Sequence, residues 1–274
     1  MASICVLETW YKHSVRLIDT HCHLNKESLF GVAGELLKEA SEAGVERVVV
    51  VGVDDAWNCR ALTLAERYAE VFAVVGWHPT SAAQFSAAAL DVVTEQLKHP
   101  RVVAIGEIGL DYHWPDATRD QQFGALRDQL DLARRTEKPV VFHCREAYPD
   151  LLDELERHGP GPYLFHCFAG DATDARRALA LGGMFGVDGP LTYPKADALR
   201  AIIKDLPRDH VVLETDTPYM APHPYRSRPN TPAMLRFINA QLAALWDLSP
   251  EQSAEITTAN AERFFGLPAT VTPW

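Results

Sequence analysis

Short apolar runs alternate with longer amphipathic stretches along most of the chain. The runs are rich in Val, Ile and Leu with few polar interruptions, which is typical of strands buried on both faces of a parallel sheet. Such strands are expected over residues 15–19, 45–51, 71–76, 102–106, 140–143, 163–166, 183–187 and 211–215. The stretches between them have the apolar spacing of helices. Helices are expected over residues 29–43, 57–68, 82–98, 119–136, 148–158, 173–181, 196–206, 233–246 and 250–265.

This succession of strands and helices predicts an α/β fold, a single-domain (β/α)8 TIM barrel, rather than an open doubly wound sheet. The first strand is not followed by a Gly-x-Gly-x-x-Gly signature, which argues against a dinucleotide-binding domain. No Gly- or Ser-rich linker divides the 274 residues. We therefore expect an N-terminal extension over residues 1–14, a barrel over 15–267 and a C-terminal tail over 268–274.

Composition narrows the possible partners. The formal net charge is −11, from 26 basic and 37 acidic side chains. A field of this sign repels nucleic acid and anionic membranes, so a polyanion has to be held by a few local groups. The apolar patch at residues 4–7 is too short for a signal sequence or a membrane span, and the five scattered cysteines suggest no disulfide framework. We expect a cytoplasmic protein with no membrane contact and no obligate protein partner.

Residues that can bind metal ions stand at the ends of five predicted strands. His21 and His23 follow the first strand, and residues two apart on a strand point to the same face. On its own this pair is more often structural than metal-binding, but four other strands end in a similar residue. These are Glu107, His143, His166 and Asp216. Since the carboxyl ends of barrel strands form the active-site face, the six side chains are expected to converge.

Four imidazoles and two carboxylates exceed what one catalytic zinc ion needs, because such an ion uses three protein ligands and an open position. We therefore expect two divalent ions. The ligands divide into two sets that share a bridging Glu107, namely His21, His23 and Asp216 for one ion and His143 and His166 for the other. Zinc, magnesium and manganese are the candidate metals, and imidazole ligands favour zinc, manganese or nickel over magnesium.

Paired ions of this kind can produce a hydroxide at neutral pH and stabilise both oxygens of a displacement. Asp216 is expected to orient that hydroxide and to pass its proton to the leaving group, which makes Asp216 and Glu107 the predicted catalytic residues. The same site could instead polarise a carbonyl in an amide or lactone. A third interpretation is a catalytically silent metal-binding scaffold.

Three cysteines stand beside the predicted ligands, namely Cys22, Cys144 and Cys167. Neighbours on a strand point to opposite faces, so these thiols are expected to pack outward against helices. Packing is favoured over metal ligation or nucleophilic catalysis, because free cysteine behaves as a small buried hydrophobe.

Six motifs together have a recognisable pattern. They are DTHCH at 19–23, GEIGLDY at 106–112, HCREA at 143–147, HCFAG at 166–170, ETDTPY at 214–219 and NAERFF at 260–265. In these motifs the chain resembles the TatD family of metal-dependent deoxyribonucleases, within the amidohydrolase superfamily of barrels. The resemblance covers about residues 15–267. It implies hydrolysis of phosphodiester bonds in DNA, usually as a 3′-to-5′ exonuclease, and it supports the metal roles assigned above.

The resemblance also suggests how substrate is held. The element GWHP at 76–79 matches the family's Gly-x-His-Pro, so His78 is expected to bind the scissile phosphate, although it could simply cap the turn that Pro79 begins. Arg145, Arg226 and Arg228 are the predicted phosphate-binding residues, and their alternative role is pairing with surface carboxylates. At 226–232 the chain reads RSRPNTP, where the family typically has Arg-Gly-Lys-x-Asn-x-Pro.

The expected substrate is DNA, preferably single-stranded or with a frayed 3′ end, because the mouth of a barrel admits a strand end more easily than a duplex. Tyr112, Trp114 and Tyr219 stand in loops expected on the active face. They could stack on unpaired bases, or they could serve only to pack the loops.

Overall fold

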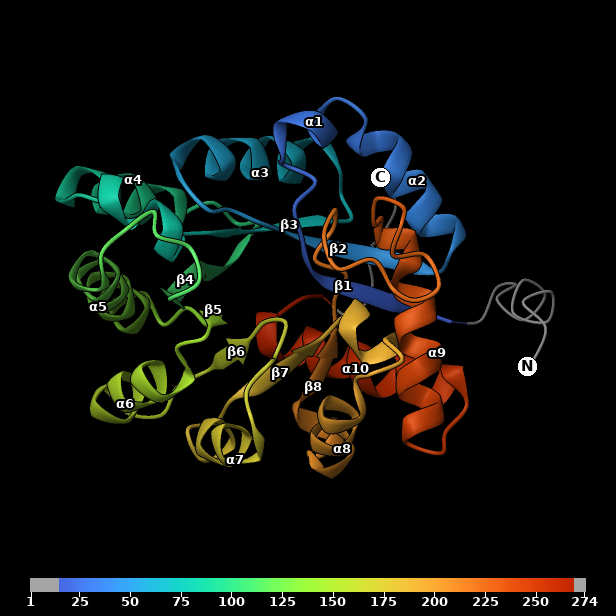
Figure 1. Ribbon diagram of the computed structural model, residues 1–274. Coiled ribbons are helices and arrows are strands. Elements are labelled where there is room, and N and C mark those ends of the chain that lie inside the picture. The colour runs from blue at the N-terminus through green and yellow to red at the C-terminus, as the bar shows by residue number, and fades with distance from the viewer. Residues whose placement is uncertain (1–14, 269–274) are drawn as a thin grey trace.

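The computed structural model describes residues 15–268 and confirms the predicted barrel. Eight parallel strands pair in the order of the sequence, and the helices lie outside them (Figure 1). The predicted N-terminal extension and all but the first residue of the predicted tail lie outside the described residues. The strands are β1 (Leu17–Cys22), β2 (Val45–Val51), β3 (Val71–Val75), β4 (Val102–Asp111), β5 (Val140–Arg145), β6 (Tyr163–Phe165), β7 (Met184–Val187) and β8 (Val211–Leu213).

The helices follow the predicted pattern with two differences. The expected helix over 29–43 is interrupted near Gly31, and the one over 82–98 starts later, because Ser86 accepts a hydrogen bond from Ala89 N and begins α4 there. The α-helices are α1 (Glu27–Phe30), α2 (Ala33–Glu42), α3 (Asp55–Arg67), α4 (Ala87–Gln96), α5 (Arg119–Thr136), α6 (Tyr148–His158), α7 (Ala172–Ala180), α8 (Asp197–Asp205), α9 (Leu235–Leu245) and α10 (Pro250–Phe265). Short 3-10 helices are η2 (Pro79–Gln84), η3 (Gly189–Thr192), η4 (Arg208–His210) and η5 (Pro232–Met234).

Strand β4 is longer than predicted and contains Glu107 in its interior. The pairing of β4 with β5 shifts register between Ile105 and Ile108, where Glu107 lies, and Glu107 N donates to Gly52 O at 3.1 Å. Strands β1 and β5 likewise extend through His21 and His143. The expectation that these three ligands follow their strands is therefore wrong by a few residues, because pairing of β1 with β2 and of β4 with β5 continues past them.

The barrel closes where β1 meets the segment after β8. Asp216 N donates to His21 O at 2.9 Å, and His23 N donates to Thr217 O at 2.7 Å. These two backbone bonds bring the first and last predicted ligands, His21 and Asp216, together, although 195 positions separate them in the chain.

Asp19 strengthens this closure from inside the barrel. Its fully buried carboxylate accepts hydrogen bonds from Thr215 N at 2.9 Å and Thr215 Oγ1 at 2.6 Å. Burial raises the pKa of Asp19 to about 8 despite these bonds. The motifs at 19–23 and 214–219 thus contact each other directly.

Helix α10 covers the amino end of the barrel. Ala261 and Phe265 pack with interior strand residues such as Val49 and Val212. Asn260 Nδ2 donates to Arg208 O and to Val211 O, both at 2.8 Å. The motif at 260–265 is therefore structural, and the carboxyl end of the barrel remains as the open face. Within residues 15–268, no helix has the length and apolar character needed to span a bilayer.

Candidate metal centre

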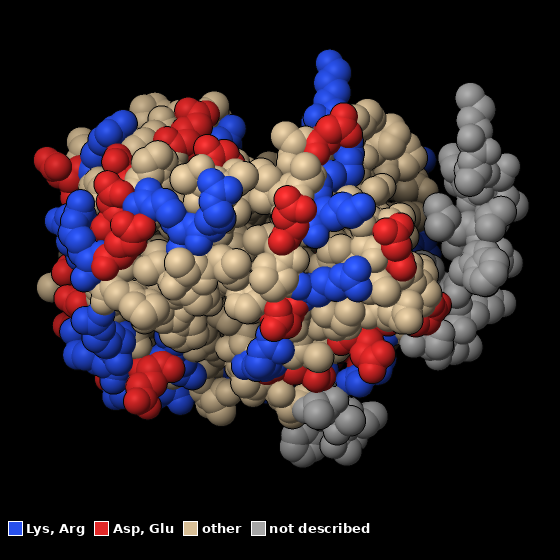
Figure 2. All heavy atoms as spheres, turned by 90° about the horizontal axis from the view of Figure 1, so that it is seen from below, with Lys and Arg blue, Asp and Glu red and all other residues tan. Residues whose placement is uncertain are grey.

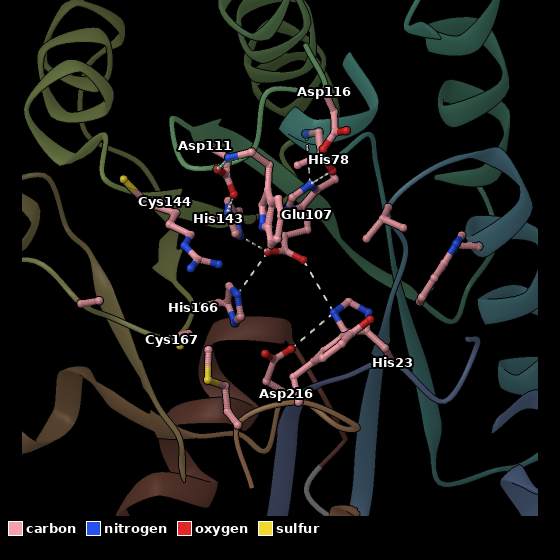
Figure 3. Close-up of a pocket in the computed structure, with 18 residues that line it drawn as sticks. His23, His78, Glu107, Asp111, Asp116, His143, Cys144, His166, Cys167 and Asp216 are labelled. Atoms are coloured by element: carbon pink, nitrogen blue, oxygen red, sulfur yellow. Dashed lines mark hydrogen bonds and ion pairs between the residues drawn. The ribbon is translucent and has the colours of Figure 1, made fainter. Parts of the chain in front are cut away.

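Glu107 lies at the centre of the predicted ligands, and its carboxylate is buried. One oxygen, Oε2, lies 3.4 Å from His21 Nε2 and 3.8 Å from His23 Nε2. The other oxygen, Oε1, lies 2.9 Å from His143 Nδ1 and 3.1 Å from His166 Nε2. Figure 3 shows the carboxylate of Glu107 between the labelled His143 and His166 on one side and His23 on the other. Its two oxygens face two different pairs of imidazoles, as a bridging ligand requires.

The first set of donors encloses a space of the size of a metal ion. His21 Nε2 and His23 Nε2 are 3.3 Å apart, and Asp216 Oδ1 lies 3.4 Å from His23 Nε2 and 4.0 Å from His21 Nε2. Ligands bound tetrahedrally at roughly 2.0–2.2 Å from zinc are about 3.3–3.6 Å apart. His21, His23 and Glu107 also form one of the groups of potential ligand atoms that lie within 4.8 Å of one another.

Hydrogen bonds on the far side of the rings orient two of the histidines. His23 Nδ1 donates to Val51 O at 3.0 Å, and His143 Nε2 donates to Asp111 Oδ2 at 2.8 Å. Each bond favours a ring hydrogen on the outer nitrogen, so the nitrogen that faces Glu107 could bind a metal ion. In this structure His143 Nδ1 lies 2.9 Å from Glu107 Oε1, and hydrogen bonds to Asp111 and Glu107 raise the pKa of His143 against the effect of burial. Burial acts to raise the pKa of Asp111, but the hydrogen bonds from His143 and from backbone N–H groups lower it to about 2.

Glu214 lies against the other two histidines and was not among the predicted site residues. It is fully buried, its Oε1 accepts from Cys167 N, and the same oxygen is 3.3 Å from His166 Nδ1. His21 and His166 stack with ring centroids 3.8 Å apart, and His21, His166 and Glu214 form a second group of potential ligand atoms. Burial acts to lower the pKa of His166, but Glu107 and Glu214 hold it well above its ordinary value.

Asp111 and Glu214 both stand in motifs that contain a predicted ligand, at 106–112 and 214–219. Their presence in those motifs was the available signal. What the sequence could not give is the pairing of each carboxylate with a histidine, because the two partners lie on different strands.

The site contains six buried carboxyl groups, which belong to Asp19, Glu107, Asp111, Asp188, Glu214 and Asp216. The pKa is lowered at Glu107, Asp111 and Asp216 and raised at Asp19 and Asp188. Among the described Lys and Arg residues only Arg47 is buried, and it pairs with Glu262 on α10 at the amino end of the barrel. Glu107, Asp111 and Asp216 therefore supply carboxylate oxygens beside four imidazoles, and this set of donors fits divalent cations.

A cavity of about 650 Å³ opens over these donors at the carboxyl end of the barrel. Five of the six predicted ligands line it, while His21 lies behind them with no exposed surface. Its wall also contains Trp57, His78, Trp114, Arg145 and Tyr219.

The position of His78 is compatible with both of its predicted roles, capping the turn at Pro79 and binding a phosphate. Its Nδ1 accepts a hydrogen bond from Thr80 N at 3.2 Å and so begins η2, as the capping alternative requires. Because Nδ1 accepts, the ring hydrogen is assigned to Nε2, which faces the cavity 3.7 Å from Glu107 Oε1. Burial and the neighbouring His143 lower the pKa of His78 to about 3, so the ring is a neutral donor at neutral pH.

The three predicted phosphate-binding arginines lie in different places. Arg145 lines the cavity, with its guanidinium 5.8 Å from the ring centroid of Trp114. Arg226 lies 4.2 Å from the ring centroid of Tyr193, and Arg228 lies 5.9 Å from that of Tyr225. Neither Arg226 nor Arg228 lines the cavity. The structure therefore brings one of the three together with the donors.

The cysteines follow the predicted outward packing only in part. Cys22 is buried in the core, with its Sγ 3.5 Å from Val49 O. Cys144 packs in the same core but also borders the cavity. For Cys167 the prediction is wrong, since it lines the cavity and its thiol donates to Asp188 Oδ2 at 3.0 Å. Strand β6 ends at Phe165, so the alternation of faces no longer applies at Cys167.

Comparison with known proteins places this geometry among related chains. The family described as TatD related DNase matches residues 18–266. A Bacillus subtilis protein named uncharacterized metal-dependent hydrolase YabD is 37% identical over 253 residues, covering 92% of this chain and 99% of its own. The Erwinia amylovora protein named 3′-5′ ssDNA/RNA exonuclease TatD is 33% identical, covering 85% of this chain and 93% of its own. The crystal structure of the Escherichia coli TatD homologue YJJV superposes with a TM-score of 0.89 at 33% identity, covering 93% of this chain and all of that one.

Replacing Glu107 tests its central position. Glu107→Ala removes the carboxylate that faces both imidazole pairs, so we expect the variant to lose tightly held metal after dialysis against divalent cations, as measured by mass spectrometry of the metals. Glu255→Ala, an exposed glutamate on α10, is the matched control and should load as the unaltered protein does. Unchanged metal content in folded Glu107→Ala protein would contradict the central role of Glu107.

Replacing Glu214 tests its role as an orienting carboxylate. Loss of a partner that orients a metal-binding histidine typically costs about 10- to 100-fold in metal affinity. We expect a loss of that size in Glu214→Gln, measured by competition with a chelating dye, while Asp205→Asn at the exposed end of α8 has no effect. Equal metal affinity in Glu214→Gln and the unaltered protein would show that Glu214 only fills space.

Proposed function

Because the chain belongs to the TatD related DNase family of metal-dependent hydrolases, we propose that it hydrolyses phosphodiester bonds of DNA as a 3′-to-5′ exonuclease. The reaction uses two divalent cations, zinc, magnesium or manganese. His21, His23 and Asp216 would hold one of them, His143 and His166 would hold the other, and Glu107 would be available to both.

The observation that carries this proposal is the placement of Glu107 between two donor sets, at the floor of a cavity that also contains two phosphate-binding groups. The Nε2–H of His78 and the guanidinium of Arg145 both border that cavity. A hydrogen-bond donor and an arginine fork suit a phosphodiester. The exonuclease name of the Erwinia amylovora relative supports the same substrate class.

When bound, the cations would lower the pKa of a water molecule and neutralise charge on the phosphoryl oxygens. Asp216 acts as the base. Burial acts to raise its pKa, but His23, His166 and His21 lower it, so the carboxylate is ionised at neutral pH. It takes the proton of the attacking water as the new P–O bond forms, and returns that proton to the leaving oxygen as the old P–O bond breaks. His78 and Arg145 hold the phosphate in place during the exchange.

The charge distribution favours a strand end over a long duplex. On the face shown in Figure 2, basic and acidic side chains are interspersed and the basic ones form no continuous stripe. That face offers no continuous track for a phosphate backbone, so the proposed binding relies on contacts made inside the cavity. Single-stranded DNA and frayed 3′ ends meet that requirement best.

Hydrolysis of an amide or lactone is the second candidate. It gains support from Arg226 and Arg228, because the two arginines that would favour a phosphate lie on aromatic rings outside the cavity lining. Arg145 and His78 remain as groups that a neutral carbonyl substrate would not use. The phosphodiester is therefore the better supported substrate.

Assays of the metal-loaded protein distinguish the two candidates. The substrates are end-labelled single-stranded DNA, the matching duplex, and a panel of lactones and amides, each with zinc, magnesium or manganese. We expect shortening of the single strand from its 3′ end, slower action on the duplex, and loss of both after chelation. Turnover of the lactone or amide panel with intact DNA would overturn the proposal.

His78 gives a second test, because its proposed role requires no metal ligation. A hydrogen bond to a charged group contributes about 1.5–3 kcal/mol, so His78→Ala should lower kcat/KM on DNA by about 10- to 100-fold with metal content unchanged. His78→Asn, which keeps an N–H donor, should recover part of the loss. Since the pKa of His78 is about 3, His78 stays neutral around pH 6.5. The pH profiles of activity in the unaltered protein and in His78→Asn should therefore have the same shape in that range. Loss of metal in His78→Ala would instead make it a ligand.

A further inference from the structure

Two pairs of a basic side chain and an aromatic ring lie on opposite sides of the barrel, Lys26 with Tyr219 and Arg145 with Trp114. Tyr219, Trp114 and Arg145 line the cavity, and Lys26 contacts it through Tyr219. The strands pair in the order β1 to β8, so the junction of β8 with β1 lies half a turn from the junction of β4 with β5. Lys26 follows β1 and Tyr219 follows β8, while Trp114 follows β4 and Arg145 ends β5. The donors around Glu107 lie between the two pairs.

The first pair is built onto the ligands of the first donor set. Lys26 Nζ donates to Tyr219 Oη at 3.0 Å and lies 4.6 Å from the centre of the Tyr219 ring. The backbone of Tyr219 is fixed, because its N–H donates to Asp216 O at 2.7 Å and its carbonyl accepts from Asn230 Nδ2 at 2.7 Å. Tyr219 lines the cavity and remains 44% exposed, so part of this side chain is accessible to a ligand.

The second pair is built in the same way onto a ligand of the second donor set. Asp111 Oδ2 accepts from His143, while Asp111 Oδ1 accepts from Trp114 N at 2.9 Å. The carboxylate that orients a predicted metal ligand therefore also fixes the loop that carries Trp114. Trp114 lines the cavity and is 51% exposed, with Arg145 at 5.8 Å from its ring.

We propose that these pairs are two base-binding subsites, one on each side of the scissile phosphate, so that the unit recognised is an unpaired dinucleotide. This inference rests on the proposed function. Tyr219 stacks on one base and Trp114 on the other, while Arg145 contacts the scissile phosphate and Lys26 neutralises the next phosphate towards the 5′ end.

Stacking is the contact that these rings can offer, because every base has a flat face and the interaction tolerates any sequence. A base inside a duplex is already stacked and paired, so it cannot reach either ring without being unstacked. The two subsites therefore explain a preference for single strands without a broad basic surface. Loop packing alone does not account for two aromatic side chains that are each about half exposed at the wall of the same cavity.

The test pairs protein variants with substrates that lack one base. Single-stranded oligonucleotides carry a tetrahydrofuran abasic unit at the 3′-terminal or at the penultimate position. Both binding of the metal-loaded protein, by fluorescence anisotropy, and release of the terminal nucleotide are measured. In the unaltered protein each abasic unit should weaken binding by about 10-fold.

Each variant should lose its response to one abasic position only. We expect Tyr219→Leu to bind the normal strand about 10-fold more weakly, with no further loss of affinity when one of the two positions is abasic. Trp114→Leu should show no further loss of affinity when the other position is abasic. Both residues are on the surface, so thermal unfolding should be unchanged. Phe123→Leu on α5, a ring beside Arg127 away from the cavity, is the matched control.

The salt dependence of binding tests whether Lys26 contacts a phosphate. Removing one phosphate contact to a single strand lowers the slope of log affinity against log salt by about 0.7. Lys26→Gln should show that change, and Lys38→Gln, an exposed lysine on α2, should not.

The outcomes separate this inference from the proposed function. If the two variants lose their binding response to different abasic positions but no nucleotide is released, the two subsites are upheld and the exonuclease is overturned. Nucleotide release in which both variants respond alike, or neither changes its response, would overturn the two subsites and leave the exonuclease standing. Absence of both binding and release would overturn both.

Discussion

The position of a single carboxylate governs the rest of this site. Glu107 is buried at the point where β4 shifts register against β5, and each of its oxygens faces a different pair of imidazoles. That arrangement requires a closed barrel, because the first donor set comes from β1 and the segment after β8, while the second comes from β5 and the segment after β6. The backbone bonds between His21 and Asp216 and between His23 and Thr217 provide the closure. Fold and chemistry therefore depend on the same contacts.

Around Glu107, several carboxylates both contact a histidine or threonine of the site and fix the backbone of a neighbouring loop. Asp111 orients His143 and also fixes the loop of Trp114. Glu214 lies against His166 and accepts from Cys167 N, and Asp19 holds Thr215 beside the ligands of the closure. Buried charges of one sign are unfavourable unless cations or hydrogen bonds compensate them. The lowered pKa values of Glu107, Asp111 and Asp216 keep anionic oxygens beside the imidazoles, which is a donor set that suits divalent cations.

Much of the fold could be predicted from the sequence, because buried parallel strands and amphipathic helices leave strong patterns. The helix bounds at 119–136, 148–158 and 250–265 agree with the structure. The extension of β4 past Glu107 could not be foreseen, since it depends on pairing with β5. The convergence of the six predicted ligands could be foreseen from strand ends alone, whereas their roles as ligands remain a proposal. The directions of side chains in loops could not be predicted. Arg226 and Arg228 stand in a recognisable loop, yet they lie on tyrosine rings outside the cavity lining. The partners Asp111 and Glu214 needed the three-dimensional arrangement.

The most direct test of the account is electron paramagnetic resonance of the protein loaded with two equivalents of Mn²⁺. Ions that share Glu107 would lie about 3.5–4 Å apart, which is close enough for their spins to couple. The account predicts the spectrum of a coupled pair, with two ions per chain and no change in secondary structure on loading. A spectrum of isolated ions, or binding that saturates at one ion per chain, would contradict the bridging role of Glu107.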